Sequence, residues 1–127
     1  MMDKKIIRVS PLGKTWLFDI DGTICKHNGY KTDGHDTLLP GAKDFFDQVA
    51  EGDKVVLLTS RDEKYAVNTE RFLSENGIKF DAIIYGLPYG ERILINDKKP
   101  SGLVTGLAIN TERDVFLDTE FVIDPNL

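Results

Sequence analysis

Short runs of apolar residues alternate along the chain with longer stretches in which apolar residues recur every three or four positions. Short apolar runs that are rich in β-branched residues and bounded by glycine or polar residues are typical of buried strands. This pattern predicts strands over residues 15–20, 54–60, 80–86 and 92–97. A further strand is a candidate over residues 103–110, and the ambiguous tail that follows is expected to be loose at its end.

Two of the longer stretches have the spacing of amphipathic helices. The first opens at Pro40 and ends at Gly52, and its apolar face comprises Ala42, Phe45, Phe46, Val49 and Ala50. The second is predicted to begin at Ser60, which matches a capping box with Glu63, and to end at Asn76-Gly77. Its buried stripe is expected to contain Tyr65, Val67, Thr69, Phe72 and Leu73.

The segment 23–39, which we call the excursion, has no regular period and contains two glycines, two histidines and many polar residues. We expect irregular structure there, with a small hairpin turning at Asn28-Gly29. The alternation of strands and helices around it predicts an α/β fold, a Rossmann-like three-layer sandwich with a mostly parallel central sheet. A chain of 127 residues suits a single domain covering residues 1–127.

Composition narrows the class of protein. Apolar residues make up 41% and charged residues 29%, which is typical of globular proteins, and we expect neither a membrane span nor a signal peptide. The single cysteine, Cys25, cannot form an internal disulfide, which fits a reducing compartment such as the cytoplasm. The net charge of −5, without a basic stripe, makes nucleic acid an unexpected primary partner.

Polar residues follow three of the predicted strands, at the point where each strand ends. They are Asp19 and Asp21, then Thr59-Ser60-Arg61, and finally Asn96-Asp97-Lys98-Lys99. Because ligand sites in parallel α/β sheets lie beyond the carboxyl ends of the strands, these groups are expected to meet at one rim.

The two acids of the first strand are the strongest candidates for chemistry. Asp19 and Asp21 are two residues apart, so they point the same way on an extended strand and need a cation or a shared proton between them. Hard oxygen ligands favour Mg²⁺, and Asp97 would be a third ligand. Ser60 and Arg61, at the predicted start of a helix, would add an anion site.

Other interpretations of these residues remain open. Asp-x-Asp-Gly in isolation is often a simple turn, and Asp-x-Asp also follows an apolar run in sugar-nucleotide-dependent transferases, which need a larger domain. An EF-hand loop is excluded because Thr23 and Ile24 stand where Asp or Asn and then Gly are required. His27, His35 and Cys25 are interpreted as surface or packing residues.

Three motifs resemble those of the haloacid dehalogenase (HAD) superfamily, in its Mg²⁺-dependent phosphatase branch. "FDIDGT" resembles the first motif, "VVLLTSR" the second and "RILIND" the acidic fourth, in the order of the family. The resemblance implies that Asp19 is the nucleophile and Asp21 the general acid and base, with a backbone carbonyl on the metal. It also implies that Thr59 binds a phosphoryl oxygen and that Asp97 holds Mg²⁺ together with Asp19.

Two positions depart from the family pattern. Leu87 stands where the lysine of the third motif is expected, so that Arg92 or Lys98 would have to supply the positive charge and bind the phosphate. In the fourth motif Asn96 takes the place of one of two acids, which leaves one negative charge fewer.

The intervals between the motifs have no room for a sizeable cap domain, so the chain resembles a small capless member. An open site suits a large substrate, or a homo-oligomer in which a neighbouring subunit shields it. The resemblance implies a Mg²⁺-dependent phosphomonoesterase that forms an aspartyl-phosphate and acts on a small metabolite such as a sugar phosphate or a nucleotide. The alternative is a catalytically impaired relative that binds a phosphorylated ligand or a partner.

Overall fold

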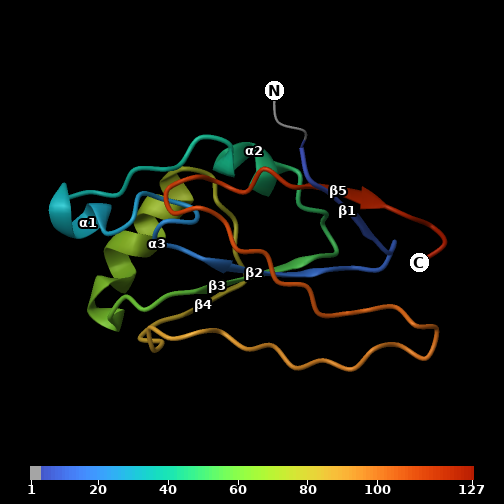
Figure 1. The fold of residues 1–127 in the computed structure, drawn as a ribbon. Coiled ribbons are helices and arrows are strands. Elements are labelled where there is room, and N and C mark those ends of the chain that lie inside the picture. The colour runs from blue at the N-terminus through green and yellow to red at the C-terminus, as the bar shows by residue number, and fades with distance from the viewer. Residues whose placement is uncertain (1–3) are drawn as a thin grey trace. The chain divides into compact units, whose positions relative to one another are not determined.

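The computed structural model describes residues 4–127 and is a mixed α/β structure with parallel strands in two small sheets (Figure 1). In chain order its elements are β1 (Ile6–Val9), β2 (Thr15–Asp19), α1 (Gly29–Thr32), α2 (Ala42–Asp47), β3 (Lys54–Leu58), the 3-10 turn η1 (Glu63–Tyr65), α3 (Ala66–Glu75), β4 (Ala82–Ile84) and β5 (Glu120–Ile123). Among the described residues, none of the helices has the length and apolar character needed to cross a membrane.

The chain divides into two compact units. The first comprises the chain up to Leu12 together with Tyr89–Asn110 and Asp118–Leu127, and the second comprises Gly13–Pro88 and Thr111–Leu117. In the first unit β1 pairs in parallel with β5, from Ile6 opposite Glu120 to Val9 opposite Ile123. Neither strand was predicted, because each is only four residues long and lies in a polar context.

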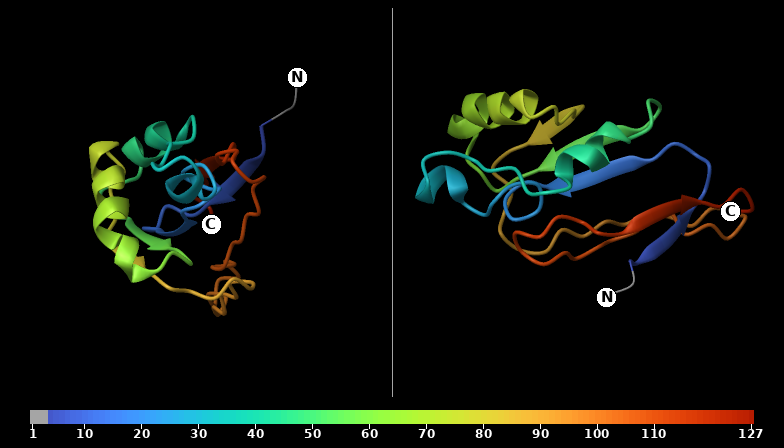
Figure 2. Two further views of the ribbon diagram at one scale, coloured as in Figure 1. Left: turned by 90° about the vertical axis from the view of Figure 1, so that its left-hand side faces the viewer. Right: turned by 90° about the horizontal axis from the view of Figure 1, so that it is seen from above.

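The second unit is built on three parallel strands in the order β2-β3-β4. Thr15 of β2 lies opposite Lys54 of β3, and Asp19 lies opposite Leu58 at the other end. The strands fall within three of the predicted apolar runs, which are therefore confirmed as strands. Figure 2 shows α3 running alongside this sheet.

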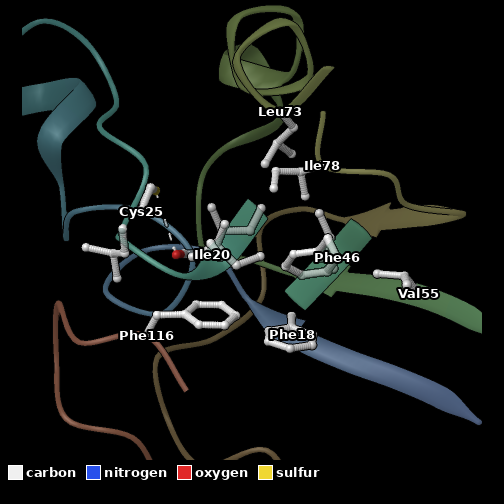
Figure 3. Packing of buried hydrophobic residues seen from close by; sticks show 12 residues of the cluster. Phe18, Ile20, Cys25, Phe46, Val55, Leu73, Ile78 and Phe116 are labelled. Atoms are coloured by element: carbon white, nitrogen blue, oxygen red, sulfur yellow. Dashed lines mark hydrogen bonds between the residues drawn. The ribbon is translucent and has the colours of Figure 1, made fainter. Parts of the chain in front are cut away.

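The core of the second unit lies on one face of this sheet. Phe18 and Leu57 are opposite each other in the register, so their side chains share that face, and both are buried. Phe46 of α2 and Leu73 of α3 belong to the same cluster (Figure 3). The rings of Phe18 and Phe46 lie 4.9 Å apart, and Phe116 from the 111–117 segment stacks parallel to Phe18 at 6.2 Å.

Helices α2 and α3 both contribute to this one face. The opposite face carries Leu17 and Ile84, which are 48% and 47% exposed. Strands of parallel sheets are usually apolar on both faces because helices cover both. The apolar character of β3 therefore identified the strand, but it did not reveal which face the helices cover.

The prediction of strands over residues 92–97 and 103–110 is wrong, because neither segment has strand structure. The two segments lie side by side through their side chains: the Nδ2 of Asn96 donates to the Oγ1 of Thr105 at 3.0 Å. Ile93 and Ile95 are 82% and 89% exposed. Apolar side chains alone do not make a strand, which also needs a partner for its backbone groups.

Both long helices are shorter than predicted. The first helix, α2, covers Ala42–Asp47, and Ala50 is exposed rather than on the buried face. The second begins with η1 after Asp62, whose carboxylate accepts a hydrogen bond from the Lys64 backbone N–H at 2.9 Å. Asp62, not Ser60, is therefore the cap.

The end and one face of α3 follow the prediction in part. Gly77 takes a left-handed conformation at φ 70°, which confirms the predicted stop. Thr69 and Leu73 are buried as expected, whereas Val67 is 69% exposed and does not belong to the buried stripe.

The excursion is closed at its base by antiparallel hydrogen bonds, not folded as a tight hairpin. Lys26 donates its backbone N–H to Thr37, and Leu39 donates to Ile24, each at 2.9 Å. Asn28 is left-handed at φ 55°, but it precedes α1 instead of turning a hairpin. The wide loop between the paired ends gives space for side chains to reach the candidate site.

Candidate functional site

The carboxyl ends of β2, β3 and β4 meet at one edge of the three-stranded sheet. Asp19 is the last residue of β2 and lies opposite Leu58, directly before Thr59. The backbone N–H of Thr59 donates to Ile84 at 3.0 Å, and that of Leu87 donates to Thr59 at 3.1 Å. Asp19, Thr59 and Leu87 thus follow three neighbouring strands at the same edge.

The loop after β2 is a tight turn that fixes both acids. The carbonyl of Ile20 accepts backbone hydrogen bonds from Thr23 and Ile24, and Gly22 adopts φ 81° to let the chain turn. The Thr23 hydroxyl donates to Asp19 Oδ2 at 3.0 Å. This bond orients the carboxylate that the sequence predicts as the nucleophile.

The 111–117 segment holds the same loop from the other side. The backbone N–H of Asp114 donates to the Gly22 carbonyl at 2.8 Å, and the Asp114 carboxylate accepts from the backbone N–H of His27 at 2.6 Å. Asp114 is itself left-handed at φ 65°. The stem of Arg113 lies close to Gly22, with its Cγ 3.2 Å from the position that a Cβ on this glycine would take.

Arg61 is buried at the centre of the site, and hydrogen bonds saturate its guanidinium. Its Nε and Nη2 donate to the two carboxylate oxygens of Asp21, both at 2.9 Å. Its Nη1 and Nη2 donate to the two oxygens of Asp36 at 3.0 and 2.7 Å, and Nη1 also donates to the Thr69 hydroxyl at 2.9 Å. These bonds use all five N–H donors of an arginine, so none is left for a phosphate.

The surroundings of Arg61 hold it in its charged form. The side chain is 1% exposed, and burial alone favours the neutral guanidine, but the hydrogen bonds and charges of Asp21 and Asp36 outweigh burial and raise the pKa of Arg61 above its usual value. The ring of Tyr30, from α1, covers the guanidinium carbon at 4.0 Å, within the range of a cation–π contact. The rings of Tyr30 and Tyr65 lie 4.9 Å apart in a T-shaped arrangement.

Asp36 is a member of this site that sequence reasoning missed. Its side chain is only 5% exposed and is paired to Arg61. In the sequence Asp36 is one of two acids near the middle of the irregular excursion, and no periodicity separates it from Asp33. Asp33 is instead paired with Lys26 in an exposed contact at 2.8 Å.

Ligand atoms of Asp21, Cys25 and Asp36 lie within 4.8 Å of one another, a spacing that would suit a metal. Arg61 already occupies the space between them, since its Nη2 reaches all three side chains and lies 3.5 Å from the Cys25 Sγ. Burial, followed by the charge of Asp36, raises the pKa of the Cys25 thiol. Cys25 therefore stays protonated and is a poor metal ligand. This group binds a guanidinium rather than a metal ion.

The remaining predicted residues are distributed over both units. Ser60 turns its hydroxyl toward the Pro88 carbonyl, to which it donates at 3.3 Å. Asp97 and Lys98 are exposed and belong to the first unit, whereas the strand ends of β2, β3 and β4 belong to the second. Their predicted roles as metal ligand and phosphate-binding residue therefore stay predictions from the sequence.

The two histidines differ in their surroundings. His35 is exposed, and its Nδ1 lies 3.1 Å from the Asp33 carbonyl. His27 is partly buried, and among the described residues its Nδ1 has no hydrogen-bond partner.

Comparison with known proteins gives a limited set of similarities. No protein-family model matches the chain, and no curated protein matches it. A chain in the structure of the Pnkp1/Rnl/Hen1 complex is similar over 72% of this chain, with 28% sequence identity and a TM-score of 0.51. A chain in the structure of the Pnkp1/Rnl/Hen1 RNA repair complex is similar over 62%, with 30% identity and a TM-score of 0.50. The similar regions cover 33% and 27% of those chains, so this chain spans a third or less of each.

Proposed function

We propose that the chain is a Mg²⁺-dependent phosphomonoesterase of the HAD superfamily that acts through an aspartyl-phosphate. The observation that carries this proposal is the arrangement of Asp19 at the end of β2, Asp21 two residues later and Thr59 at the end of the adjacent β3. The proposal includes the Rossmann-like three-layer sandwich of the family and a reducing, cytoplasmic location. The substrate would be a small phosphorylated metabolite, such as a sugar phosphate or a nucleotide.

The chemistry assigns one role to each acid. A carboxylate oxygen of Asp19, oriented by the Thr23 hydroxyl, attacks phosphorus while the bond between phosphorus and the leaving oxygen breaks. The leaving oxygen takes a proton from Asp21. In the second step Asp21 removes a proton from water, which attacks the aspartyl-phosphate, releases inorganic phosphate and restores Asp19. The Thr59 hydroxyl would bind a phosphoryl oxygen.

The charges at this edge of the sheet fit a requirement for a cation. Asp19, Asp21 and Asp36 contribute three carboxylates, and Arg61 contributes one positive charge that is already used by two of them. An anionic phosphate would be repelled unless further positive charge were present. Bound Mg²⁺ would supply that charge, held by the Asp19 carboxylate and, as the resemblance implies, by the backbone carbonyl of Asp21 and by Asp97.

The first test is the Asp19→Asn variant, assayed for phosphate release from a panel of phosphorylated substrates with and without Mg²⁺. The panel should include sugar phosphates, nucleotides and, because one of the two similar chains comes from an RNA repair complex, phosphorylated RNA oligonucleotides. We expect Mg²⁺-dependent turnover by the natural chain and its loss in Asp19→Asn. Asp44→Asn on the exposed face of α2 is the matched control. Full Mg²⁺-dependent activity of Asp19→Asn would show that the mechanism is wrong.

A second candidate is a catalytically impaired relative that binds a phosphorylated ligand or a partner. Two observations favour it: Leu87 stands where a lysine is expected, and Arg61 has no N–H left for a phosphate. Binding of a phosphorylated compound in the presence of Mg²⁺ without release of phosphate, measured by calorimetry and a phosphate assay on the same panel, would support this candidate against the first.

A further inference from the structure

The ion-pair network of Arg61 links the excursion to the proposed acid and base. Arg61 holds Asp21 through Nε and Nη2, on the side of its guanidinium, and holds Asp36 through Nη1 and Nη2, at its end. The Arg61 side chain is 1% exposed, and those of Asp21 and Asp36 are 15% and 5% exposed. Asp21 is thus the member of this network with the most access to solvent.

We propose that Asp36 is a positioning residue for the acid and base step. A guanidinium is planar, and two pairs of parallel hydrogen bonds fix both its plane and its rotation. Asp36 fixes one edge of Arg61, and the adjacent edge then sets the direction of the Asp21 carboxylate. This inference rests on the proposed phosphatase function and adds to it that the excursion, through Asp36, completes the catalytic site.

Three further contacts keep Arg61 in this position. Thr69 of α3 accepts from Nη1, the ring of Tyr30 covers the guanidinium carbon, and the Arg61 backbone N–H donates to the Thr59 hydroxyl at 3.0 Å. None of these contacts fixes the rotation of the guanidinium within its own plane as a second carboxylate does. Without Asp36, Nη1 of Arg61 would keep only the Thr69 hydroxyl, and Nη2 would keep Asp21 and the weak Cys25 Sγ contact.

The leaving group provides a readout that separates positioning from general stability. An alkyl phosphate has a basic leaving oxygen and needs a proton from Asp21, whereas 4-nitrophenyl phosphate releases a stable anion and needs none. Since kcat/KM covers the steps up to departure of the leaving group, loss of acid catalysis lowers it much more for the alkyl ester. Loss of folded protein lowers it equally for both.

The experiment compares kcat/KM of the natural chain, Asp36→Asn and Asp33→Asn on glycerol 2-phosphate and 4-nitrophenyl phosphate with Mg²⁺. We expect Asp36→Asn to lose at least about tenfold more activity on the alkyl ester than on the aryl ester, the pattern also expected for Asp21→Asn. Asp33→Asn makes the same chemical change in the excursion at an exposed pair and should match the natural chain on both esters.

The outcomes separate the two proposals. An equal loss on both esters, or no loss on either, by a folded Asp36→Asn variant overturns the positioning role and leaves the phosphatase proposal intact. If the natural chain releases phosphate from neither ester nor any member of the substrate panel, the phosphatase proposal fails, and the positioning role with it. If Asp36→Asn does not fold by circular dichroism, Asp36→Glu keeps the charge but displaces Arg61, and the same unequal loss is then required of it.

Discussion

At the scale of single residues, Arg61 shows how the same side chain can be assigned two different roles. Its place after a strand and before a helix predicted a contact with phosphate. In the structure its five N–H donors go to two carboxylates and a hydroxyl. A buried guanidinium needs all its donors satisfied and its charge compensated, and Asp21, Asp36 and Thr69 meet these needs together.

Replacing Arg61 by methionine tests how much this network contributes to the stability of the protein. The variant would leave Asp21 and Asp36 without their partner, and removing one partner of a buried ion pair destabilises a protein by about 3–5 kcal/mol. We expect a fall of this size in the free energy of unfolding, measured with urea. Arg71→Met on the exposed side of α3 is the control and should change it by less than about 0.5 kcal/mol. Equal effects of the two variants would contradict the central place of Arg61.

Gly22 can be tested against a glycine with nearly the same backbone conformation. Gly22 and Gly34 have φ 81° and φ 79°, but only at Gly22 would a new Cβ meet other atoms, at 3.2 Å from Arg113 and 3.6 Å from His27. Gly34→Ala should lower the free energy of unfolding by about 1–2 kcal/mol, because of the strained backbone conformation alone. Gly22→Ala should destabilise the protein more than Gly34→Ala does, as measured by thermal denaturation. It should also displace the loop that carries Asp19 and Asp21. A smaller effect at Gly22 would contradict the close packing of this loop.

The thiol of Cys25 is expected to be inert while the protein is folded. Burial and the charge of Asp36 raise its pKa, so the folded protein keeps the proton that an unfolded cysteine loses above about pH 8.5. The unfolded state then binds fewer protons, so stability should be unaffected below that pH and fall as pH rises above it. Iodoacetamide at pH 8.5 should modify the chain in urea much faster than in buffer. Cys25→Ala should remove this part of the pH dependence, and rapid labelling of the folded chain would contradict the burial.

At the scale of elements, two apolar residues of α3 were predicted to share one buried stripe, but the structure separates them. Leu73 is fully buried in the core, whereas Val67 is 69% exposed. We expect Leu73→Ala to lower the free energy of unfolding by about 2–5 kcal/mol and Val67→Ala to change it by less than about 0.5 kcal/mol. Urea denaturation of both variants measures this directly. A large effect of Val67→Ala would mean that the sequence pattern described the helix better than the structure does.

The elements that could be predicted are those whose apolar pattern agrees with the glycine and polar residues at their ends. Strands β2, β3 and β4 each contain a run of three or more apolar residues, and α3 ends at a glycine that takes the left-handed conformation. The start of the second helix was predicted at Ser60 because Ser60 and Glu63 match a capping box. Asp62 is also a good cap residue, and the tertiary structure, which turns Ser60 to the Pro88 carbonyl, makes Asp62 the cap.

The candidate site could be predicted where adjacent strands bring its residues together, and not where a loop does. Asp19 and Thr59 lie at the ends of paired strands, so strand order alone brings them close. Asp36 and Tyr30 reach Arg61 from the excursion, and their contacts depend on the path of an irregular loop. No local pattern encodes such a path, because it depends on contacts between residues far apart in the sequence.

At the scale of the whole molecule, the two units differ in how their backbones are held. The second unit contains the three-stranded sheet, its helices and a shared apolar core, whereas the first contains the two-stranded β1–β5 sheet and the long segment 89–110. Backbone that is not paired in strands or helices opens at low free energy and is the preferred substrate of proteases. The units should therefore differ in their resistance to proteolysis.

Limited trypsin digestion followed by mass spectrometry tests this difference. Arg92 and Lys98 lie in the segment 89–110, which contains no helix or strand, whereas Lys54 lies in β3 and Arg71 in α3. We expect the first cuts after Arg92 or Lys98, well before any cut after Lys54 or Arg71. Resistance at Arg92 and Lys98 equal to that at Lys54 would contradict the structure and restore the sequence prediction of a strand over residues 92–97.

The same digestion, repeated with Mg²⁺, tests the metal role that the sequence assigns to Asp97. A residue that binds a cation orders the backbone around it, and a ligand that binds the native state slows local opening in proportion to its occupancy. If Asp97 is a ligand of the proposed magnesium site, millimolar Mg²⁺ should slow the cut after Lys98, and Asp97→Asn should abolish this protection without changing the rate in the absence of the metal. Equal protection of the natural chain and Asp97→Asn would remove Asp97 from the site, and would leave Asp19 and Asp21 as the remaining predicted protein ligands.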